Sequence, residues 1–175
     1  MKKSVFKIIL AALFIALAFL LPFLTSQIRE VGNMLLPMHL PVLICGFILG
    51  EKYGALVGFV SPLLRSFILG MPVFPIRAIP MAFELAAYGF LAGLLYKLLP
   101  KKPFFLYLNL VLTLILGRIV WAALKYIMIF FGGKFGFEIF LLDGFVNAWL
   151  GIVLQFIIIP PIVLFLKKEK LIADK

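Results

Sequence analysis

The stretch FFLYLNLVLTLILGRIVWAALKYIMIFF, residues 104–131, decides the fold class of this chain. It is apolar for longer than the roughly 20 residues that a helix needs to cross a bilayer. The charged residues within it are Arg118 and Lys125. Strands of globular proteins are much shorter than this run. The stretch therefore predicts a membrane-spanning helix that carries two cations.

Further apolar runs, separated by Pro, Gly and charged residues, predict the same kind of helix elsewhere in the chain. The six expected spans are 5–21, 34–49, 55–69, 81–99, 104–131 and 139–166. Only 14% of the residues are charged, against about 25% in an ordinary soluble domain. The continuous apolar runs also lack the period-two alternation of a strand barrel. We therefore expect an all-α polytopic membrane protein, with one six-helix domain over residues 1–175, in which Pro160-Pro161 bends or ends the last regular span.

The Lys and Arg residues outside the spans favour one orientation of this bundle. One side collects Lys2, Lys3, Lys7, Lys52, Lys97, Lys101, Lys102, Lys167, Lys168, Lys170 and Lys175, and the other collects Arg29, Arg77 and Lys134. Positive charge in short loops tends to stay in the cytoplasm. Both termini are therefore expected to be cytoplasmic, and the external connections are expected at 22–33, 70–80 and 132–138.

Polar residues inside the expected spans gather toward the outer side. They are His39, Arg65, Glu84, Arg118, Lys125, Asp143 and Asn147. An ionisable residue at membrane depth is costly, and it usually pairs with another charge or lines a wet cavity. The sequence thus predicts a polar pocket that is open to the outside.

The spacing of these residues indicates what the pocket binds. Arg118, Trp121 and Lys125 lie at i, i+3 and i+7, along one stripe of a helix. Arg can clamp a carboxylate through two parallel hydrogen bonds, while an aromatic ring packs against the apolar body of an organic ligand. Because the charged members are three cations and two acids, a ligand with an anionic group is favoured.

Structural roles remain open for several of these residues. Arg65 and Glu84 are also suited to an ion pair that joins the third and fourth spans. Lys125 and Asp143 are equally suited to the interface, where they would face water. The structural alternative for His39, which lies between Pro37 and Pro41, is that it satisfies free backbone groups near a helix start.

The external connection 70–80 contains three prolines and several apolar side chains. We expect it to act as a lid over the pocket, with Met71, Phe74 and Arg77 as its gating residues. The alternative is a rigid turn between two helices.

Composition and motifs exclude several other functions. The net charge of +10 comes from Lys and Arg residues that flank apolar runs, so it does not indicate a nucleic-acid surface. No catalytic, nucleotide-binding or metal-ligand motif is present, so we expect neither an enzyme nor a cofactor or metal. A membrane enzyme acting on lipids would have only Asp143 and His39 to use.

Three stretches resemble the substrate-binding S components of energy-coupling factor vitamin transporters. They are Ala11-Ala12-Leu13-Phe14-Ile15-Ala16, the stretch Leu36-Pro37-Met38-His39-Leu40-Pro41-Val42-Leu43 leading to Gly46 and Gly50, and the proline-rich region before Ala82-Phe83-Glu84. The resemblance covers nearly the whole chain and includes its small six-span format.

The resemblance implies a subunit that binds a vitamin or precursor from outside, in the cytoplasmic membrane of a prokaryote. Its implied partners are a transmembrane coupling subunit and two ATP-binding-cassette ATPases. Ala12 and Ala16 match the small residues that contact the coupling subunit, and small side chains permit close helix approach. Gly89 and Gly93 form a similar pair, suited either to a partner or to packing within the bundle.

The region near His39 is most similar to members assigned to pantothenate, whose carboxylate Arg118 or Arg65 would hold. A pyridine or pterin vitamin, a riboflavin-type ring and a queuosine precursor remain candidates, and Glu84 and Asp143 leave a cationic or neutral ligand open. The alternative function is a self-sufficient, ion-coupled secondary transporter or channel for a small organic solute. The absence of an internal repeat and the short chain count against it.

Overall fold

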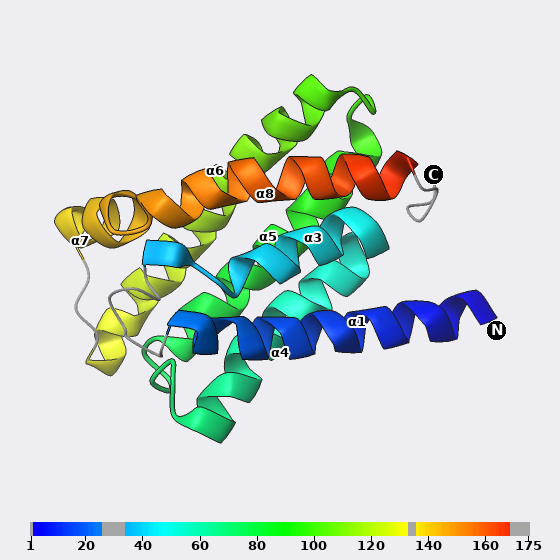
Figure 1. Cartoon of the computed structure of the whole chain (residues 1–175). Coiled ribbons are helices and arrows are strands. Elements are labelled where there is room, and N and C mark those ends of the chain that lie inside the picture. Colours follow the sequence, from blue (N-terminus) through cyan, green and yellow to red (C-terminus); the bar gives the residue numbers. More distant parts are fainter. Residues whose placement is uncertain (1, 26–33, 133–135, 169–175) are drawn as a thin grey trace.

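The computed structural model describes residues 2–25, 34–132 and 136–168, and every regular element in these ranges is helical (Figure 1). The elements are α1 (Lys2–Leu20), η1 (Leu21–Thr25), α3 (His39–Leu49), α4 (Glu51–Leu69), α5 (Ala78–Leu98), α6 (Pro103–Ile127), η2 (Met128–Phe131), α7 (Phe137–Leu141), η3 (Leu142–Val146) and α8 (Trp149–Lys168). η1 and η2 are 3₁₀ helices and η3 is a π-helical turn. The expected all-α fold is confirmed.

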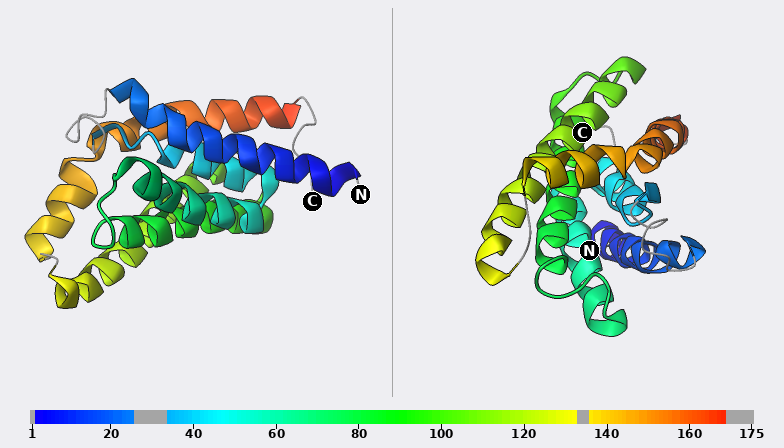
Figure 2. Two further views of the ribbon diagram at one scale, coloured as in Figure 1. Left: turned by 90° about the horizontal axis from the view of Figure 1, so that it is seen from below. Right: turned by 90° about the vertical axis from the view of Figure 1, so that its left-hand side faces the viewer.

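The connections between the long helices lie at two ends of the molecule (Figures 1 and 2). The start of α1, the α3–α4 turn, the α5–α6 turn and the end of α8 lie at one end. The end of α1, the α4–α5 loop and the end of α6 lie at the other, which we call the distal end. This arrangement suits two termini on the same side of a membrane. Which side of the membrane the termini face stays a prediction. Arg29 and Lys134, two of the three cations expected on the outer side, lie outside the described residues.

Five helical stretches of the described chain are long and apolar enough to cross a membrane. They are Ser4–Phe23, Glu51–Leu69, Ala78–Leu98, Pro103–Phe131 and Trp149–Leu166. They correspond to five of the six expected spans. The chain is therefore a multi-pass membrane protein.

The expected second span, 34–49, forms a shorter helix than the sequence suggests. α3 has 11 residues, so it rises about 16 Å, roughly half of a bilayer core. Residues 36–38 precede it in a non-helical conformation, and Leu36 has a φ of 49°. Proline disfavours the α conformation of the residue before it, which explains why Pro37 delays the helix start.

The expected last span, 139–166, is divided. α7 and the π-helical turn η3 occupy its first part, where the backbone N–H of Asn147 donates to the carbonyl of Leu142 at 2.7 Å. A regular helix begins only at Trp149 and continues through Pro160 and Pro161 to Lys168, so the prolines do not end it. Membrane helices tolerate proline because neighbouring groups can satisfy the freed carbonyls.

Glycines allow α4 and α5 to approach each other at the backbone. A Cβ on Gly58 would lie 2.2 Å from the carbonyl oxygen of Leu85, and one on Gly89 would lie 2.1 Å from that of Gly54. No side chain fits at these contacts. Gly93 packs equally closely against the start of α4. The pair Gly89 and Gly93 therefore serves packing within the bundle.

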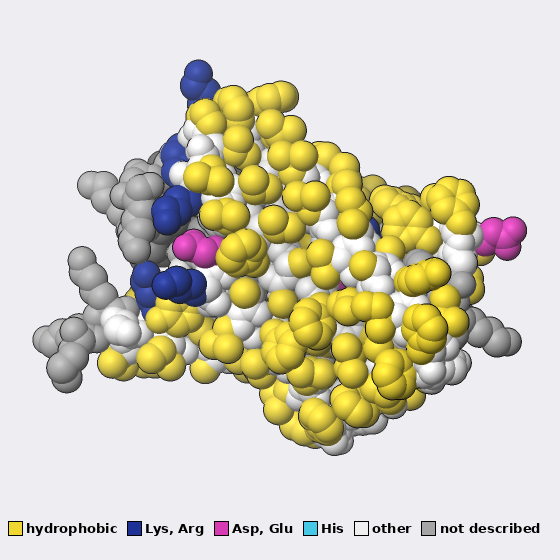
Figure 3. Space-filling view, turned by 180° about the vertical axis from the view of Figure 1, so that it is seen from behind, with side chains coloured by type: hydrophobic (Ala, Val, Ile, Leu, Met, Phe, Trp, Pro, Cys, Tyr) yellow, Lys and Arg dark blue, Asp and Glu magenta, His cyan; other side chains and the backbone are white. Residues whose placement is uncertain are grey.

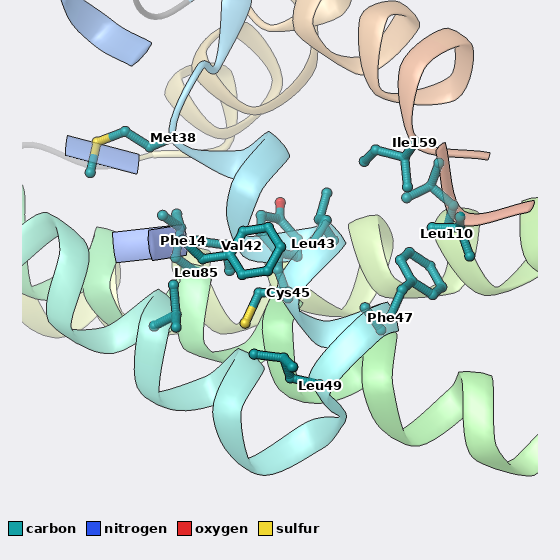
Figure 4. Packing of buried hydrophobic residues seen from close by; sticks show 14 of the residues in the cluster. Phe14, Met38, Val42, Leu43, Cys45, Phe47, Leu49, Leu85, Leu110 and Ile159 are labelled. Carbon is teal, nitrogen blue, oxygen red and sulfur yellow. The ribbon is translucent and has the colours of Figure 1, made fainter. Parts of the chain in front are cut away.

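Buried apolar side chains form one cluster around α3 (Figure 4). Val42 and Leu43 of α3 lie near Leu85 of α5, and Phe47 lies toward Leu110 of α6 and Ile159 of α8. The face of the molecule shown in Figure 3 is also largely apolar, and Lys and Arg side chains gather at one end of it. This distribution suits helices that face lipid along their length and water at their ends.

Candidate functional site

A buried ion pair joins α5 to α6 in the half of each helix that is nearer the distal end. Arg118 Nη1 donates to Glu84 Oε1 at 2.7 Å, and the hydroxyl of Tyr88 donates to the same oxygen at 2.9 Å. Tyr88 reaches Glu84 because it lies one turn further along the same face of α5. All three side chains are buried. A carboxylate at this depth requires such partners, since an unpaired buried charge is strongly destabilising.

His39, at the start of α3, turns its ring toward this pair. Its Nε2 lies 3.9 Å from Glu84 Oε1, beyond hydrogen-bond distance, and its ring centroid lies 5.3 Å from that of Tyr88. The residue is 2% exposed, and neither ring nitrogen has a hydrogen-bond partner in the described parts of the chain. The His39 ring thus lies beside the Glu84 carboxylate and the Tyr88 ring.

Trp121 and Lys125 extend the cluster along α6. The Arg118 guanidinium carbon lies 5.9 Å from the centre of the Trp121 ring, and Lys125 Nζ lies 5.7 Å from it. Both distances are within the range of cation–π interactions. The stripe expected from the i, i+3, i+7 spacing is thus present, with the indole between the two cations.

The segment formed by α7 and η3 covers this part of the cluster. A Cβ on Gly144 would lie 3.9 Å from the Trp121 ring and 4.0 Å from Arg118 Cδ, and the rings of Phe140 and Trp121 are 6.3 Å apart. The side chains of Arg118 and Trp121 are consequently buried and do not line the open pocket that the sequence suggests.

Asp143 and Asn147 lie on the exposed side of this covering segment. The side-chain amide of Asn147 donates to Asp143 Oδ1 at 3.2 Å. Both residues are exposed, which agrees with the alternative that Asp143 faces water.

Arg65 is buried at a different place. Its Nη1 donates to the carbonyl of Phe19, near the end of α1, at 3.1 Å, and its guanidinium lies 5.5 Å from the ring centre of Phe23. The ion pair considered between Arg65 and Glu84 is absent from the described residues, since Glu84 pairs with Arg118. Arg65 therefore ties α4 to α1.

The 70–80 connection lies at the distal end and contains cis peptide bonds before Pro72 and Pro75. Phe74 packs on Phe67 of α4, with ring centroids 5.5 Å apart. Met71 and Arg77 are exposed. The loop thus rests on the end of α4.

The sequence model of one protein family, described as ECF transporter, substrate-specific component, matches residues 6–163. The chain belongs to this family. No curated protein and no solved structure matches it. As a substrate-specific component, it is the subunit of a membrane transporter that recognises the transported molecule. The prediction that the chain is a substrate-binding subunit of an energy-coupling factor transporter is confirmed to that extent.

In this substrate-specific component, Ala12 and Ala16 are exposed on α1, whereas Ala11, Phe14 and Ala18 face the bundle. The small-residue surface expected to meet a partner is therefore accessible.

Sequence reasoning missed several buried polar residues of the ECF component, among them Tyr88 and Gln155. Tyr88 could have been found from its spacing of one turn after Glu84. Gln155 stands out only as an isolated amide within the apolar run of α8.

Proposed function

We propose that this protein captures a small anionic vitamin or vitamin precursor from outside the cell, with pantothenate as the best candidate. It then works with a transmembrane coupling subunit and two ATP-binding-cassette ATPases in the cytoplasmic membrane of a prokaryote. Both termini face the cytoplasm, and the distal end faces outward.

The observation that carries the proposal is the buried guanidinium of Arg118 beside Trp121. Arg118 uses Nη1 for Glu84, and a guanidinium has five donors in a fixed fork. The remaining donors suit a ligand carboxylate, while the indole provides a face for the apolar part of the ligand. Lys125, half-buried on the other side of Trp121, adds positive charge at the same place.

Glu84 has a complementary role in this proposal. It holds Arg118 in place without the ligand, so the cation is neither unpaired nor free to turn away. His39 joins the proposed set of binding residues beside the pair, and Asp143 and Asn147 join it from the exposed side of the covering segment. Arg65, which contacts α1, is a structural residue in this proposal.

The segment that covers Arg118 and Trp121 must move for a ligand to enter. We assign this gating to α7 and η3 together with the 70–80 loop, in which Met71, Phe74 and Arg77 are exposed. Lid movements of this kind commonly take microseconds to milliseconds. Phe74→Ala removes the contact with Phe67, and we expect it to raise the rate of ligand dissociation in stopped-flow measurements.

The exposed face of α1 that contains Ala12 and Ala16 supports the partner part of the proposal. Small side chains let another helix come close, and an interface of this kind can form and separate because it requires little side-chain ordering. The coupling subunit is the expected occupant.

Mass spectrometry of small molecules that co-purify with the detergent-extracted protein tests the proposal, followed by titration of wild type, Arg118→Ala and Arg65→Ala with pantothenate. We expect Arg118→Ala to weaken binding by at least about 1.5–3 kcal/mol, the scale of a charge-assisted hydrogen bond. Unchanged affinity in Arg118→Ala would exclude the carboxylate clamp, and Arg65→Ala serves as the comparison. Uptake into vesicles that lack ATPases, driven by an ion gradient, would instead support a self-sufficient secondary transporter.

A further inference from the structure

α8 carries a buried polar side chain that the Glu84–Arg118 pair does not use. Gln155 is 0% exposed, and neither Oε1 nor Nε2 has a hydrogen-bond partner among the residues described. An unsatisfied amide is costly inside any protein, and more so in a membrane, where water cannot easily supply the missing bonds. Such a group is a candidate for contact with a ligand.

Gln155 lies on the side of α8 that packs against α3 and α6. Gly151, Gln155, Ile159 and Val163 follow one another at intervals of four residues and are all buried, whereas Val153 is exposed. Residues at this spacing share one face of a helix. Ile159 lies in the apolar cluster near Leu110 (Figure 4).

α3, which begins at His39, starts close to a contact with α8. A Cβ on Gly151 would lie 2.8 Å from the carbonyl group of Leu35, so α8 touches the chain just before α3. Both helices then run in the same direction (Figure 1). His39 follows Leu35 at the start of α3, and Gln155 follows Gly151 by one turn of α8, so both residues come after this contact on helices that run in the same direction.

The chemistry of the two side chains differs from that of the ion pair. Neutral imidazole offers one donor and one acceptor, and a primary amide offers two donors and a carbonyl oxygen. Neither ring nitrogen of His39 has a hydrogen-bond partner within the described ranges, so both residues present unused donors and acceptors there. Together they match a neutral group that also donates and accepts, and a secondary amide is such a group.

We propose that Gln155 and His39 form a neutral subsite beside the Glu84–Arg118 pair and that this subsite binds an amide group of the substrate. This inference rests on the proposed function, because the pair holds the anionic end of the same molecule. His39 connects the two subsites, since its Nε2 lies 3.9 Å from Glu84. The substrate is thus a carboxylate that also contains an amide, as pantothenate does.

Entry of a ligand between α3 and α8 requires α8 to move outward. In the spanning part of α8 28% of the residues are buried, against 50% in α5, so α8 is held by fewer buried contacts. The irregular turn η3 directly precedes it and provides a place where the chain can bend.

Titration of the full-length, detergent-purified protein with two probes tests the subsite. Pantothenate has both a carboxylate and an amide, whereas octanoate has only the carboxylate. We expect Gln155→Met to weaken pantothenate binding by about 10- to 100-fold, because a hydrogen-bonding partner of the ligand is lost. Octanoate affinity should be equal in both proteins. If octanoate binds neither the wild type nor Gln155→Met, the difference between their pantothenate affinities is the test of the subsite.

Val153→Met is the matched control, because it places the same side chain on the exposed face of α8. It should leave both affinities unchanged. An unchanged pantothenate affinity in Gln155→Met would overturn the subsite, and so would an equal loss for both probes.

Thermal unfolding of the ligand-free protein separates failure of the subsite from failure of the proposed substrate. Replacing an unpartnered buried amide by an apolar side chain of similar size should raise the midpoint by about 2–4 °C. A lower midpoint would mean that Gln155 has a structural hydrogen bond, and would overturn the inference. If pantothenate does not bind the wild type, the proposed ligand is wrong, while a raised midpoint in Gln155→Met still supports the subsite.

Discussion

Glu84 and Arg118 are 34 residues apart in the sequence and form a 2.7 Å ion pair between α5 and α6. The pair is buried, and the Tyr88 hydroxyl shares the carboxylate oxygen. A contact of this kind holds two helices in register and at the same time keeps a guanidinium in the interior of the bundle. Its structural and binding roles can be separated by experiment.

Removal of one member of the pair should destabilise the protein strongly. Arg118→Met leaves the Glu84 carboxylate buried and uncompensated, which costs about 3–5 kcal/mol. The double variant Glu84→Gln/Arg118→Met should lose less than the sum of the single changes, because no charge is left unpaired. Unfolding in detergent measures all three variants. A strictly additive loss would contradict the direct pairing.

A change of shape at constant charge should affect binding more than stability. Arg118→Lys keeps a cation opposite Glu84 but loses the planar fork that matches a carboxylate. We expect pantothenate affinity to fall at least about tenfold while the unfolding midpoint changes little. Arg65→Lys is the control, because Arg65 contacts the Phe19 carbonyl and the Phe23 ring. If Arg65→Lys lowered the affinity as much, the clamp could not be assigned to Arg118.

The close contact of α4 and α5 should not tolerate a methyl group. A Cβ at Gly58 would lie 2.2 Å from a backbone oxygen, so Gly58→Ala forces the helices apart and should cost about 1–3 kcal/mol or prevent folding. Gly136→Ala is the matched control, because no atom of the described residues lies within 4 Å of a Cβ there. Expression level and thermal unfolding provide the comparison. Equal stability of the two variants would argue against the observed helix spacing.

A bulky side chain on the exposed face of α1 should block assembly with the coupling subunit. Ala12→Trp and Ala16→Trp prevent close helix approach, whereas ligand binding should stay at the wild-type level because neither residue contacts the polar cluster. Ala123→Trp, at an exposed alanine of α6, is the control. Co-purification with the coupling subunit and the ATPases gives the readout. Loss of assembly in Ala123→Trp alone would place the interface on α6.

The features that follow from local helix geometry were predictable from the sequence. Arg118, Trp121 and Lys125 lie within two turns of one helix, so their spacing alone predicts that the indole lies beside both cations, as observed. The partner of Glu84 was not predictable in this way. Arg65 and Arg118 have equally suitable charge and depth, and the choice depends on which neighbouring helix turns its cation toward α5.

Hydropathy also could not predict that α3 is short or that the last expected span is divided. Both segments are apolar throughout, and hydropathy does not distinguish a full span from a short helix after a turn at Pro37 or a helix interrupted by η3. Gln155 was missed for a related reason, because the sequence does not show whether a single amide in an apolar run has hydrogen-bond partners in the folded protein.

The sequence by itself determined that the chain is helical, lies in a membrane and carries polar groups toward one end of its spans, because hydrophobic length and charge distribution act over neighbouring residues. The tertiary structure decided which of these groups meet: Glu84 with Arg118, Arg65 with α1, and Gly144 over Trp121. These contacts join residues far apart in the chain, and their geometry depends on how the glycine-lined helices pack.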